Sequence, residues 1–302
     1  MKQLDNNSPK IEAEPTCPRR PRVALMGEFS AGKSTLANLM IGTDPLPVQV
    51  VSTQLPPVWI SHGHRDSALV DLEGNETTCD LDEITSCDPA DIAYVRYFRK
   101  EEILERCDII DMPGISDPNM AAEAWQRVMP FADAVVWCSP ATQAWRQSEA
   151  AVWETVEPEV QELSMLVITR GDMLLNEKDK TKVLRRVKAQ AGDQFAHVTM
   201  MSLTLAREAE NDDTLWLESG ADDFVDAFLK MLDTVNARLR AASGEDGAHV
   251  NAANQSEEPD WSADTVGQVT PRRPVARQSK KVELAQDALQ PGDPTSFVPK
   301  FS

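Results

Sequence analysis

Eight consecutive residues near the N-terminus constrain the fold of this chain more than any other feature. Residues 27–34 read GEFSAGKS, which matches the G-x-x-x-x-G-K-S pattern of a phosphate-binding loop. The apolar run before it, residues 23–26 (VALM), is typical of a buried parallel strand, and residues 34–40 (STLANLM) are typical of a helix. Between such a strand and helix, glycines let the backbone wrap closely around phosphates, while N–H groups at the helix N-terminus face the anion. The sequence therefore predicts a nucleotide site in an α/β fold.

Two side chains of this loop have chemistry of their own. Lys33 supplies a mobile positive charge for the β- and γ-phosphates, and the Ser34 hydroxyl can ligate Mg²⁺. The residues expected to bind nucleotide in and beside the loop are Gly27, Glu28, Phe29, Ser30, Ala31, Gly32, Lys33, Ser34 and Thr35.

The second part of the predicted site is the tetrapeptide DMPG at residues 111–114, which follows the short strand-like run CDIIDM. In a P-loop hydrolase, D-x-P-G brings an aspartate to a Mg²⁺-bound water and a glycine N–H to the γ-phosphate. We therefore assign Asp111 to the metal site and Gly114 to the γ-phosphate. A threonine before this strand is needed as a further Mg²⁺ ligand, and Thr53 in TQLP is the candidate, with Ser52 as the alternative. The expected metal ligands are Ser34, Thr53 and Asp111.

The third part follows another strand-like run, MLVIT. Residues 169–172 read TRGD and match T/N-K-x-D with arginine in place of lysine. Asp172 can accept two hydrogen bonds from guanine, at N1–H and at the exocyclic amino group, and adenine does not offer this pair of donors. The Arg170 guanidinium can lie over the purine face. The sequence therefore predicts GTP, with Thr169, Arg170 and Asp172 at the base and Ser202, after the last predicted strand, in a loop at the base edge.

Four stretches together, GEFSAGKSTLANLM, LPVQVVSTQLP, DMPG and TRGD, resemble the GTPase (G) domain of the dynamin superfamily in its bacterial dynamin-like form, over residues 22–242. Ser30, the pair Leu46 and Pro47, and the T-x-x-P of residues 53–56 distinguish this superfamily from small Ras-like GTPases. The resemblance implies hydrolysis of GTP to GDP and phosphate, assisted by nucleotide-dependent homodimerisation. It also implies that Ser30 helps to hold a charge-compensating K⁺ or Na⁺. The residues expected in catalysis are Ser30, Lys33, Thr53 and Gly114.

Departures from the family pattern leave a second function open. Phe29 occupies the position where eukaryotic dynamins carry a glutamine that orients the attacking water. A full dynamin also needs a helical stalk and a membrane tip, whereas a polar tail follows here, so we expect a G domain without its own stalk. The alternative is a nucleotide-dependent switch or adaptor with negligible hydrolysis, which acts through a separately encoded partner docked on the helix predicted at 222–242 or on the tail. Residues 141–149 (ATQAWRQSE) resemble a surface loop that flanks the nucleotide in this superfamily.

Strand-like and helix-like segments alternate through the second half of the chain. This alternation predicts a mostly parallel sheet covered on both faces, the three-layer α/β sandwich of P-loop NTPases. Helices are expected at 121–131, 147–156, 177–191 and 222–242. In the first half, residues 67–72 are interpreted as the hairpin partner of a strand at 58–61, and residues 93–98 as an exposed edge strand.

Composition sets limits on domains, partners and location. We expect a flexible lead at 1–21, the G domain at 22–242 and a disordered acidic and polar tail at 243–302. The net charge of −19 argues against nucleic acid or an anionic membrane held by bulk electrostatics. No run approaches the ~20 apolar residues of a membrane span, and the N-terminus lacks the apolar core of a signal peptide. These two absences predict a cytoplasmic protein, for which peripheral contact with a membrane through a partner stays open. The five cysteines are scattered and never spaced as C-x-x-C, which predicts reduced thiols.

Overall fold

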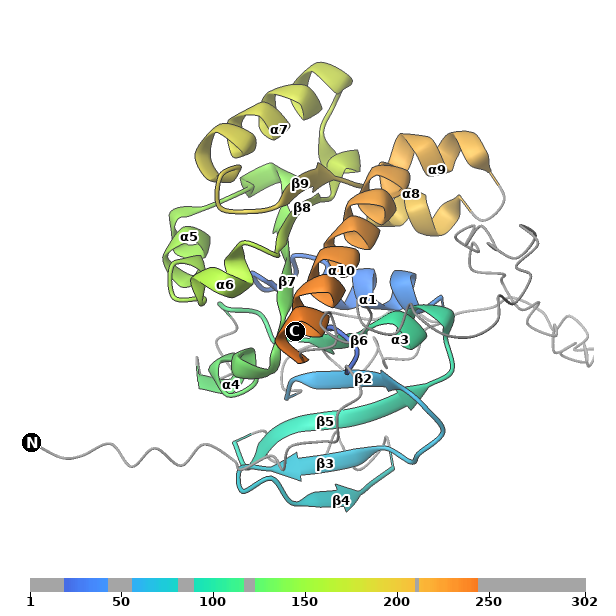
Figure 1. Cartoon of the computed structure of the whole chain (residues 1–302). Coiled ribbons are helices and arrows are strands. Elements are labelled where there is room, and N and C mark those ends of the chain that lie inside the picture. Colours follow the sequence, from blue (N-terminus) through green and yellow to red (C-terminus); the bar gives the residue numbers. More distant parts are fainter. Residues whose placement is uncertain (1–18, 43–55, 81–89, 117–122, 210–211, 244–302) are drawn as a thin grey trace, which may run out of the picture.

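Helices cover both faces of the parallel part of one nine-stranded sheet (Figure 1). The computed structural model describes residues 19–42, 56–80, 90–116, 123–209 and 212–243. The strands lie in the order β4-β3-β5-β2-β6-β1-β7-β8-β9. This architecture confirms the predicted α/β sandwich. The predicted lead and tail fall, for residues 1–18 and 244–302, outside the described residues.

Five strands of the sheet run parallel to one another and carry the predicted site at their ends. They are β1 (Arg22–Gly27), β6 (Asp108–Asp111), β7 (Ala134–Pro140), β8 (Met165–Thr169) and β9 (His197–Met200). Residues 23–26 of β1 and residues 165–168 of β8 are completely buried, as a strand covered by helices on both faces requires. Because parallel strands point their carboxyl ends to the same edge, the residues that follow β1, β6 and β8 meet there.

The other four strands pair differently from the prediction. They are β2 (Val58–His62), β3 (Ala68–Asp71), β4 (Glu76–Thr78) and β5 (Ile92–Arg99). The predicted hairpin between residues 58–61 and 67–72 is wrong, because β5 lies between β2 and β3, parallel to the first and antiparallel to the second. The edge position predicted for residues 93–98 is wrong for the same reason, since β5 has a strand on each side and β4 forms this edge.

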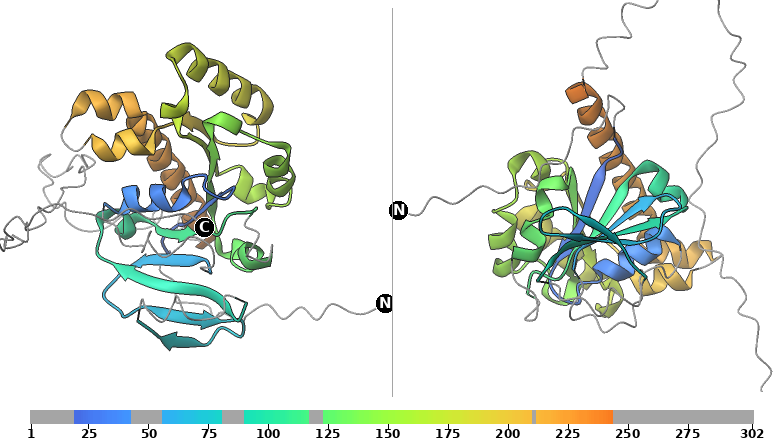
Figure 2. Two further views of the ribbon diagram at one scale, coloured as in Figure 1. Left: turned by 180° about the vertical axis from the view of Figure 1, so that it is seen from behind. Right: turned by 90° about the horizontal axis from the view of Figure 1, so that it is seen from below.

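Among the described residues, ten helices and turns divide into two layers, which Figure 2 shows on opposite sides of the sheet. One layer contains α1 (Lys33–Ile41), α3 (Glu102–Arg106), α8 (Leu203–Glu208), α9 (Asp213–Ser219) and α10 (Ala221–Ser243). The other contains α4 (Glu123–Gln126), the 3₁₀ turn η1 (Met129–Phe131), α5 (Gln147–Trp153), α6 (Pro158–Gln161) and α7 (Glu177–Ala191). Two further 3₁₀ turns, η2 (Ala141–Gln143) and η3 (Gly171–Met173), follow β7 and β8.

The long helix α10 lies close to the bounds predicted for it and packs on its own domain through an apolar stripe. Phe224, Phe228, Leu232 and Val235 are buried, with exposed fractions between 0% and 4%. Each such side chain contributes about 1.5–3 kcal/mol when it leaves water. The apolar face of α10 is therefore covered within the domain, and a partner could reach only the polar face of this helix.

The helix predicted at 121–131 is broken in its described part into α4 and η1. Pro130 stands at the start of η1, where it has no N–H to continue an α-helical ladder.

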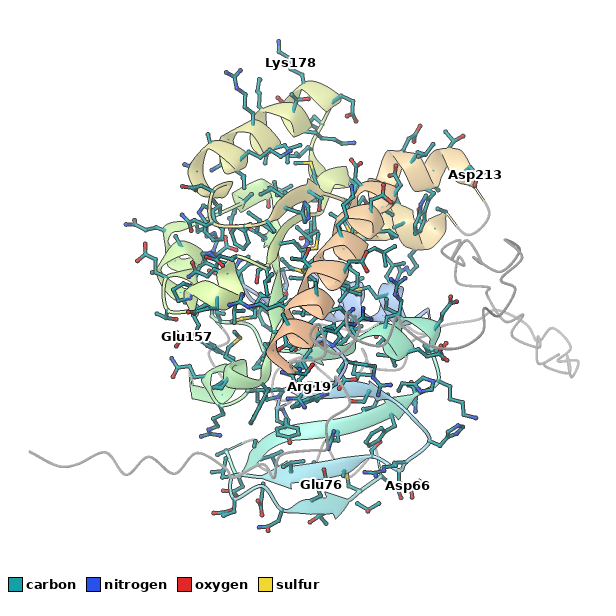
Figure 3. The ribbon with its side chains drawn as sticks, viewed as in Figure 1. Arg19, Asp66, Glu76, Glu157, Lys178 and Asp213 are labelled. Atoms are coloured by element: carbon teal, nitrogen blue, oxygen red, sulfur yellow. The ribbon has the colours of Figure 1, made fainter. Side chains whose placement is uncertain are left out.

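On the same face, α7 agrees with its predicted bounds and carries Lys178 at the opposite end of the molecule from Glu76 of β4 (Figure 3).

The three described cysteines are buried and form no disulfide, as predicted for reduced thiols. They are Cys79, Cys107 and Cys138, and burial raises the pKa of the Cys107 and Cys138 thiols to about 12. Such thiols are protonated and unreactive at neutral pH. In the part of the chain that the structure describes, no helix has the length and apolar character needed to cross a bilayer.

Candidate nucleotide-binding site

The predicted phosphate-binding loop connects β1 to α1 at the carboxyl edge of the parallel strands. Gly27, the last residue of β1, has φ 140°, and a Cβ on it would collide with the carbonyl oxygen of Cys138 on the neighbouring strand. Gly114 meets the loop from the other side, where a Cβ would lie only 2.7 Å from the Cα of Phe29. Both glycines are therefore required by close backbone approach, and the D-x-P-G segment lies directly against the loop.

The side chain of Lys33 is buried against the backbone of the phosphate-binding loop. Lys33 is 7% exposed, and its Nζ donates hydrogen bonds to the carbonyl oxygens of Gly27 at 3.2 Å and Glu28 at 2.9 Å. It begins α1, whose N-cap Gly32 has a left-handed backbone. The ammonium group is thus held at the end of the helix where backbone N–H groups favour an anion.

Ser34 and Asp111 are brought together as the metal prediction requires. The Ser34 hydroxyl donates a hydrogen bond of 2.6 Å to Oδ2 of Asp111. Burial raises the pKa of the Asp111 carboxyl, and the hydrogen bond from Ser34 and the charge of Lys33 oppose this rise. Within the described residues, Oδ1 of Asp111 is buried and has no hydrogen-bond partner.

This oxygen donor set fits a magnesium ion. A hydroxyl beside a carboxylate with a free buried oxygen is the kind of hard ligand that Mg²⁺ takes in nucleotide sites. Thr53, the third predicted ligand, and its alternative Ser52 lie outside the described residues. The metal assignment therefore stays a prediction, supported by the pairing of Ser34 with Asp111.

The end of β8 is tied to the phosphate-binding loop by two hydrogen bonds. The Thr169 hydroxyl donates to the carbonyl oxygen of Ala31 at 2.7 Å. Arg170 has a left-handed backbone with φ 57°, and its Nη2 donates to the carbonyl oxygen of Ser30 at 2.6 Å. The predicted base motif and the phosphate-binding loop are thus parts of one site.

Asp172 and Ser202, predicted for the base end, lie in contact. The Ser202 hydroxyl, on a residue 3% exposed, donates a hydrogen bond of 2.6 Å to Oδ1 of Asp172. The same hydroxyl caps α8 by accepting from the N–H of Leu205 at 3.2 Å. Because Ser202 is fixed by the helix and Asp172 is exposed, the serine holds the carboxylate at the surface where a base would approach.

Two contacts of the loop involve residues that the sequence motifs did not assign to the site. The N–H of Phe29 donates to the Ser116 hydroxyl at 3.2 Å, and the Ser148 hydroxyl donates to Oε1 of Glu28 at 2.8 Å. Ser116 follows Gly114 by two residues, so its closeness in sequence to D-x-P-G could have indicated it. Ser148 lies in the segment 141–149, where only the family resemblance pointed to the nucleotide.

The remaining predicted residues are at the surface of the loop or beside it. Ser30 is exposed and has φ 56°, Phe29 is 40% exposed, and Thr35 is exposed on the first turn of α1. Their roles stay predictions.

The chain is similar to known proteins in sequence and in fold. Residues 23–170 match the model of the Dynamin family. Dynamin-like protein 2 of Campylobacter jejuni is 23% identical over 220 residues, which cover 70% of this chain and 35% of that protein. The isoniazid-induced protein IniC of Mycobacterium tuberculosis is 28% identical over 152 residues, 45% of this chain and 29% of that protein.

Among solved structures, a member of an oligomerised bacterial dynamin pair is similar with a TM-score of 0.53 and 15% identity, over 73% of this chain and 36% of that one. That pair is described as providing a mechanism for long-range sensing and tethering of membranes. At this identity the likeness concerns the fold. The chain spans about a third of the length of these proteins.

Proposed function

Because this chain belongs to the dynamin superfamily, matched over residues 23–170, we propose that it binds GTP and hydrolyses it to GDP and phosphate. One observation supports the proposal: hydrogen bonds bring the loop after β1 together with the ends of β6 and β8. Ser34 bonds Asp111 at the end of β6, and Thr169, three residues before Asp172, bonds the loop carbonyl of Ala31.

At the phosphate end, the loop backbone and Lys33 bind the β- and γ-phosphates. Gly114 lies against the loop, and its N–H would meet the γ-phosphate. Ser34, Asp111 and Thr53 would hold Mg²⁺, which neutralises charge on the phosphate oxygens. Water attacks the γ-phosphate directly, so no covalent intermediate with the protein is needed. The protein contributes by positioning the reacting groups and by stabilising the negative charge on the phosphate oxygens.

At the base end, Asp172 selects guanine. Its exposed carboxylate accepts from N1–H and from the amino group of the base, and Ser202 keeps it in the required orientation. The loss of a paired hydrogen bond to a charged group costs about 1.5–3 kcal/mol, which separates guanine from adenine by a factor of ten or more.

Hydrolysis is assisted by dimerisation and by a monovalent cation in this proposal. Ser30, on the exposed side of the loop, helps to hold K⁺ or Na⁺ near the phosphates. A second copy of the chain would cover the site in the GTP state. The bacterial dynamin pair that resembles this chain is described as oligomerised, which supports self-association. That pair is also described as acting on membranes, which supports a peripheral role there through a partner.

A second function, a switch with negligible hydrolysis, is favoured by one observation. Phe29 is 40% exposed at the position next to Gly114 and has no polar group to orient a water molecule. In that case a partner protein would bind the GTP-bound form, and the groups that assist hydrolysis would come from another protein.

Nucleotide titration tests the base assignment. We expect Kd values for GTP and GDP at least tenfold lower than for ATP and ADP. Asp172→Asn should lose guanine preference and gain binding of xanthosine triphosphate, since xanthine carries a carbonyl where guanine carries the amino group. Equal binding of guanine and adenine nucleotides would overturn the proposal.

Phosphate release then separates the enzyme from the switch. With GTP and Mg²⁺ at saturation, the turnover per protein molecule should rise with protein concentration if dimerisation assists hydrolysis. A rate per molecule that stays constant and slow, with GTP still bound, would favour the switch.

A further inference from the structure

Glu28 is the first variable residue of the phosphate-binding loop. Its side chain is hydrogen-bonded to a residue outside the loop. Glu28 is 6% exposed, and its Oε1 accepts the 2.8 Å hydrogen bond from the hydroxyl of Ser148, which lies 120 residues later in the chain. Its backbone carbonyl accepts from Lys33 Nζ at 2.9 Å. Glu28 is therefore fixed by two hydrogen bonds: Lys33 bonds its backbone carbonyl, and Ser148 of α5 bonds its carboxylate.

Glu149, the residue after Ser148, fixes the backbone at the start of α5. Glu149 is completely buried, and its Oε1 accepts from Trp137 Nε1 at 3.0 Å. Its Oε2 accepts from the Ser139 hydroxyl at 2.9 Å and from the N–H of Arg146 at 2.8 Å. A buried carboxylate without donors would be costly, so these three donors both stabilise Glu149 and lock β7 to the start of α5.

The segment before Ser148 stores backbone strain. Trp145 has φ 58°, a left-handed conformation that is costly for a residue with a side chain. Its ring packs edge-on against Trp137 and Phe195, and Arg186 Nη2 donates to the carbonyl oxygen of Ala144 at 2.9 Å. Such strain persists only where surrounding contacts enforce one geometry, and it concentrates at functional sites.

From these contacts we infer that Ser148 is a positioning residue for nucleotide binding, which acts through Glu28 to preset the phosphate-binding loop. This inference rests on the proposed function and adds a residue outside the loop to it. A phosphate site gains affinity when its N–H groups already point at the place of the anion. Without the Ser148 hydroxyl, Glu28 loses its outside anchor and the loop populates the binding-competent state less.

Titration of the full chain with fluorescent GTP and GDP tests the inference. Ser148→Ala should raise both Kd values about tenfold, the effect of losing one hydrogen bond to a charged group. Ser148→Thr keeps the hydroxyl and should restore both values. The matched control is Thr155→Ala. Thr155 follows α5, and its exposed hydroxyl donates a hydrogen bond to the carbonyl oxygen of Val152, so its removal should leave both Kd values unchanged.

The double variant with Glu28→Ala distinguishes positioning through Glu28 from a general effect on α5. In the Glu28→Ala background, Ser148→Ala should change the Kd less than twofold, because the acceptor of its hydrogen bond is already gone. Wild-type affinity in Ser148→Ala, or the same penalty in both backgrounds, would overturn the inference.

Amide hydrogen exchange without nucleotide provides a readout that does not depend on GTP binding. Exchange at residues 27–34 should be faster in Ser148→Ala than in the wild type and in Thr155→Ala, and unchanged exchange would overturn the inference. A wild-type chain that binds neither GTP nor GDP would instead overturn the proposed function, and the exchange rates would still decide whether Ser148 controls the loop.

Discussion

At the scale of single residues, Asp111 combines a predicted role in Mg²⁺ binding with a cost to the fold. The residue is 8% exposed, and burial raises the pKa of its carboxyl above the ordinary value, so ionisation at neutral pH opposes folding. Asp111→Asn removes that charge and can still accept from Ser34. We expect the variant without nucleotide, in EDTA, to unfold at a higher temperature than the wild type at pH 7, because it no longer buries this charge.

The pH dependence has a definite sign. A group with a raised pKa in the folded state costs stability as pH rises from its unfolded value through its folded value. The difference between variant and wild type should therefore be largest at pH 7 and should vanish as the pH falls below about 3.8. With Mg²⁺ and GTP the order should reverse, since the wild type alone keeps the metal ligand. A nucleotide-free variant that is less stable than the wild type at pH 7 would contradict this prediction.

Ser202 carries two roles that can be separated by a matched control. Ser202→Ala loses the hydrogen bond to Asp172 and the cap of α8 together, so we expect a loss of about 1 kcal/mol in stability and about a tenfold rise in the Kd for GTP. Asp212→Ala loses only a cap, since Asp212 accepts from the N–H groups of Thr214 and Leu215 at the start of α9. Thermal unfolding and nucleotide titration should show a similar loss of stability in both variants and weaker GTP binding only in Ser202→Ala.

The residues of the candidate site differ in how far the sequence could predict them. Asp111 and Asp172 could be predicted because each follows an apolar run, and the ends of parallel strands meet at one edge. Ser148 could not be assigned from motifs, because its contact with Glu28 depends on the strained turn at Trp145, which no sequence spacing encodes. Ser116 reaches the loop only because Gly114 lets two backbones approach closely.

At the scale of elements, sequence patterns predicted the buried helices and parallel strands better than the pairing of β2 to β5. An apolar run such as residues 165–168 has few alternatives to a buried strand. In β5, Tyr94 and Arg96 alternate with buried Val95 and Tyr97, which is the pattern of a strand exposed on one face. The pattern did not indicate that β3 would pair with β5 and not with β2, because pairing partners depend on long-range contacts.

The packing of α10 gives a prediction at this scale. Phe228 is 2% exposed and stacks on Phe224 with ring centroids 5.7 Å apart. Phe228→Ala should lower the free energy of unfolding by about 3–5 kcal/mol, because the helix cannot close the cavity fully. Leu217→Ala on the neighbouring helix α9 is the control: Leu217 is 61% exposed, and its loss should change stability by less than about 0.5 kcal/mol. Urea unfolding curves measure both, and a small effect of Phe228→Ala would show that α10 is not part of the cooperative core.

At the scale of the whole molecule, the net charge of −19 works against the proposed dimer. Two copies of an acidic chain repel each other over distances set by the Debye length, about 10 Å at 0.1 M salt. Added salt screens this repulsion, so the dimer formed with GDP and aluminium fluoride, a mimic of the transferring phosphate, should become more stable as ionic strength rises.

Sedimentation velocity measures this effect, provided that the proposed monovalent cation site is kept constant. Choline chloride should be raised from 50 to 400 mM while KCl is held at a fixed low concentration, so that only screening changes. The dimer fraction should increase with choline chloride and stay negligible with GDP alone. A dimer that weakens with salt would mean that local opposite charges outweigh the net repulsion, and the interface would then have to include cationic side chains. The exposed face of α7, with Lys178, Lys182 and Arg185 one helical turn apart, would be the first place to substitute.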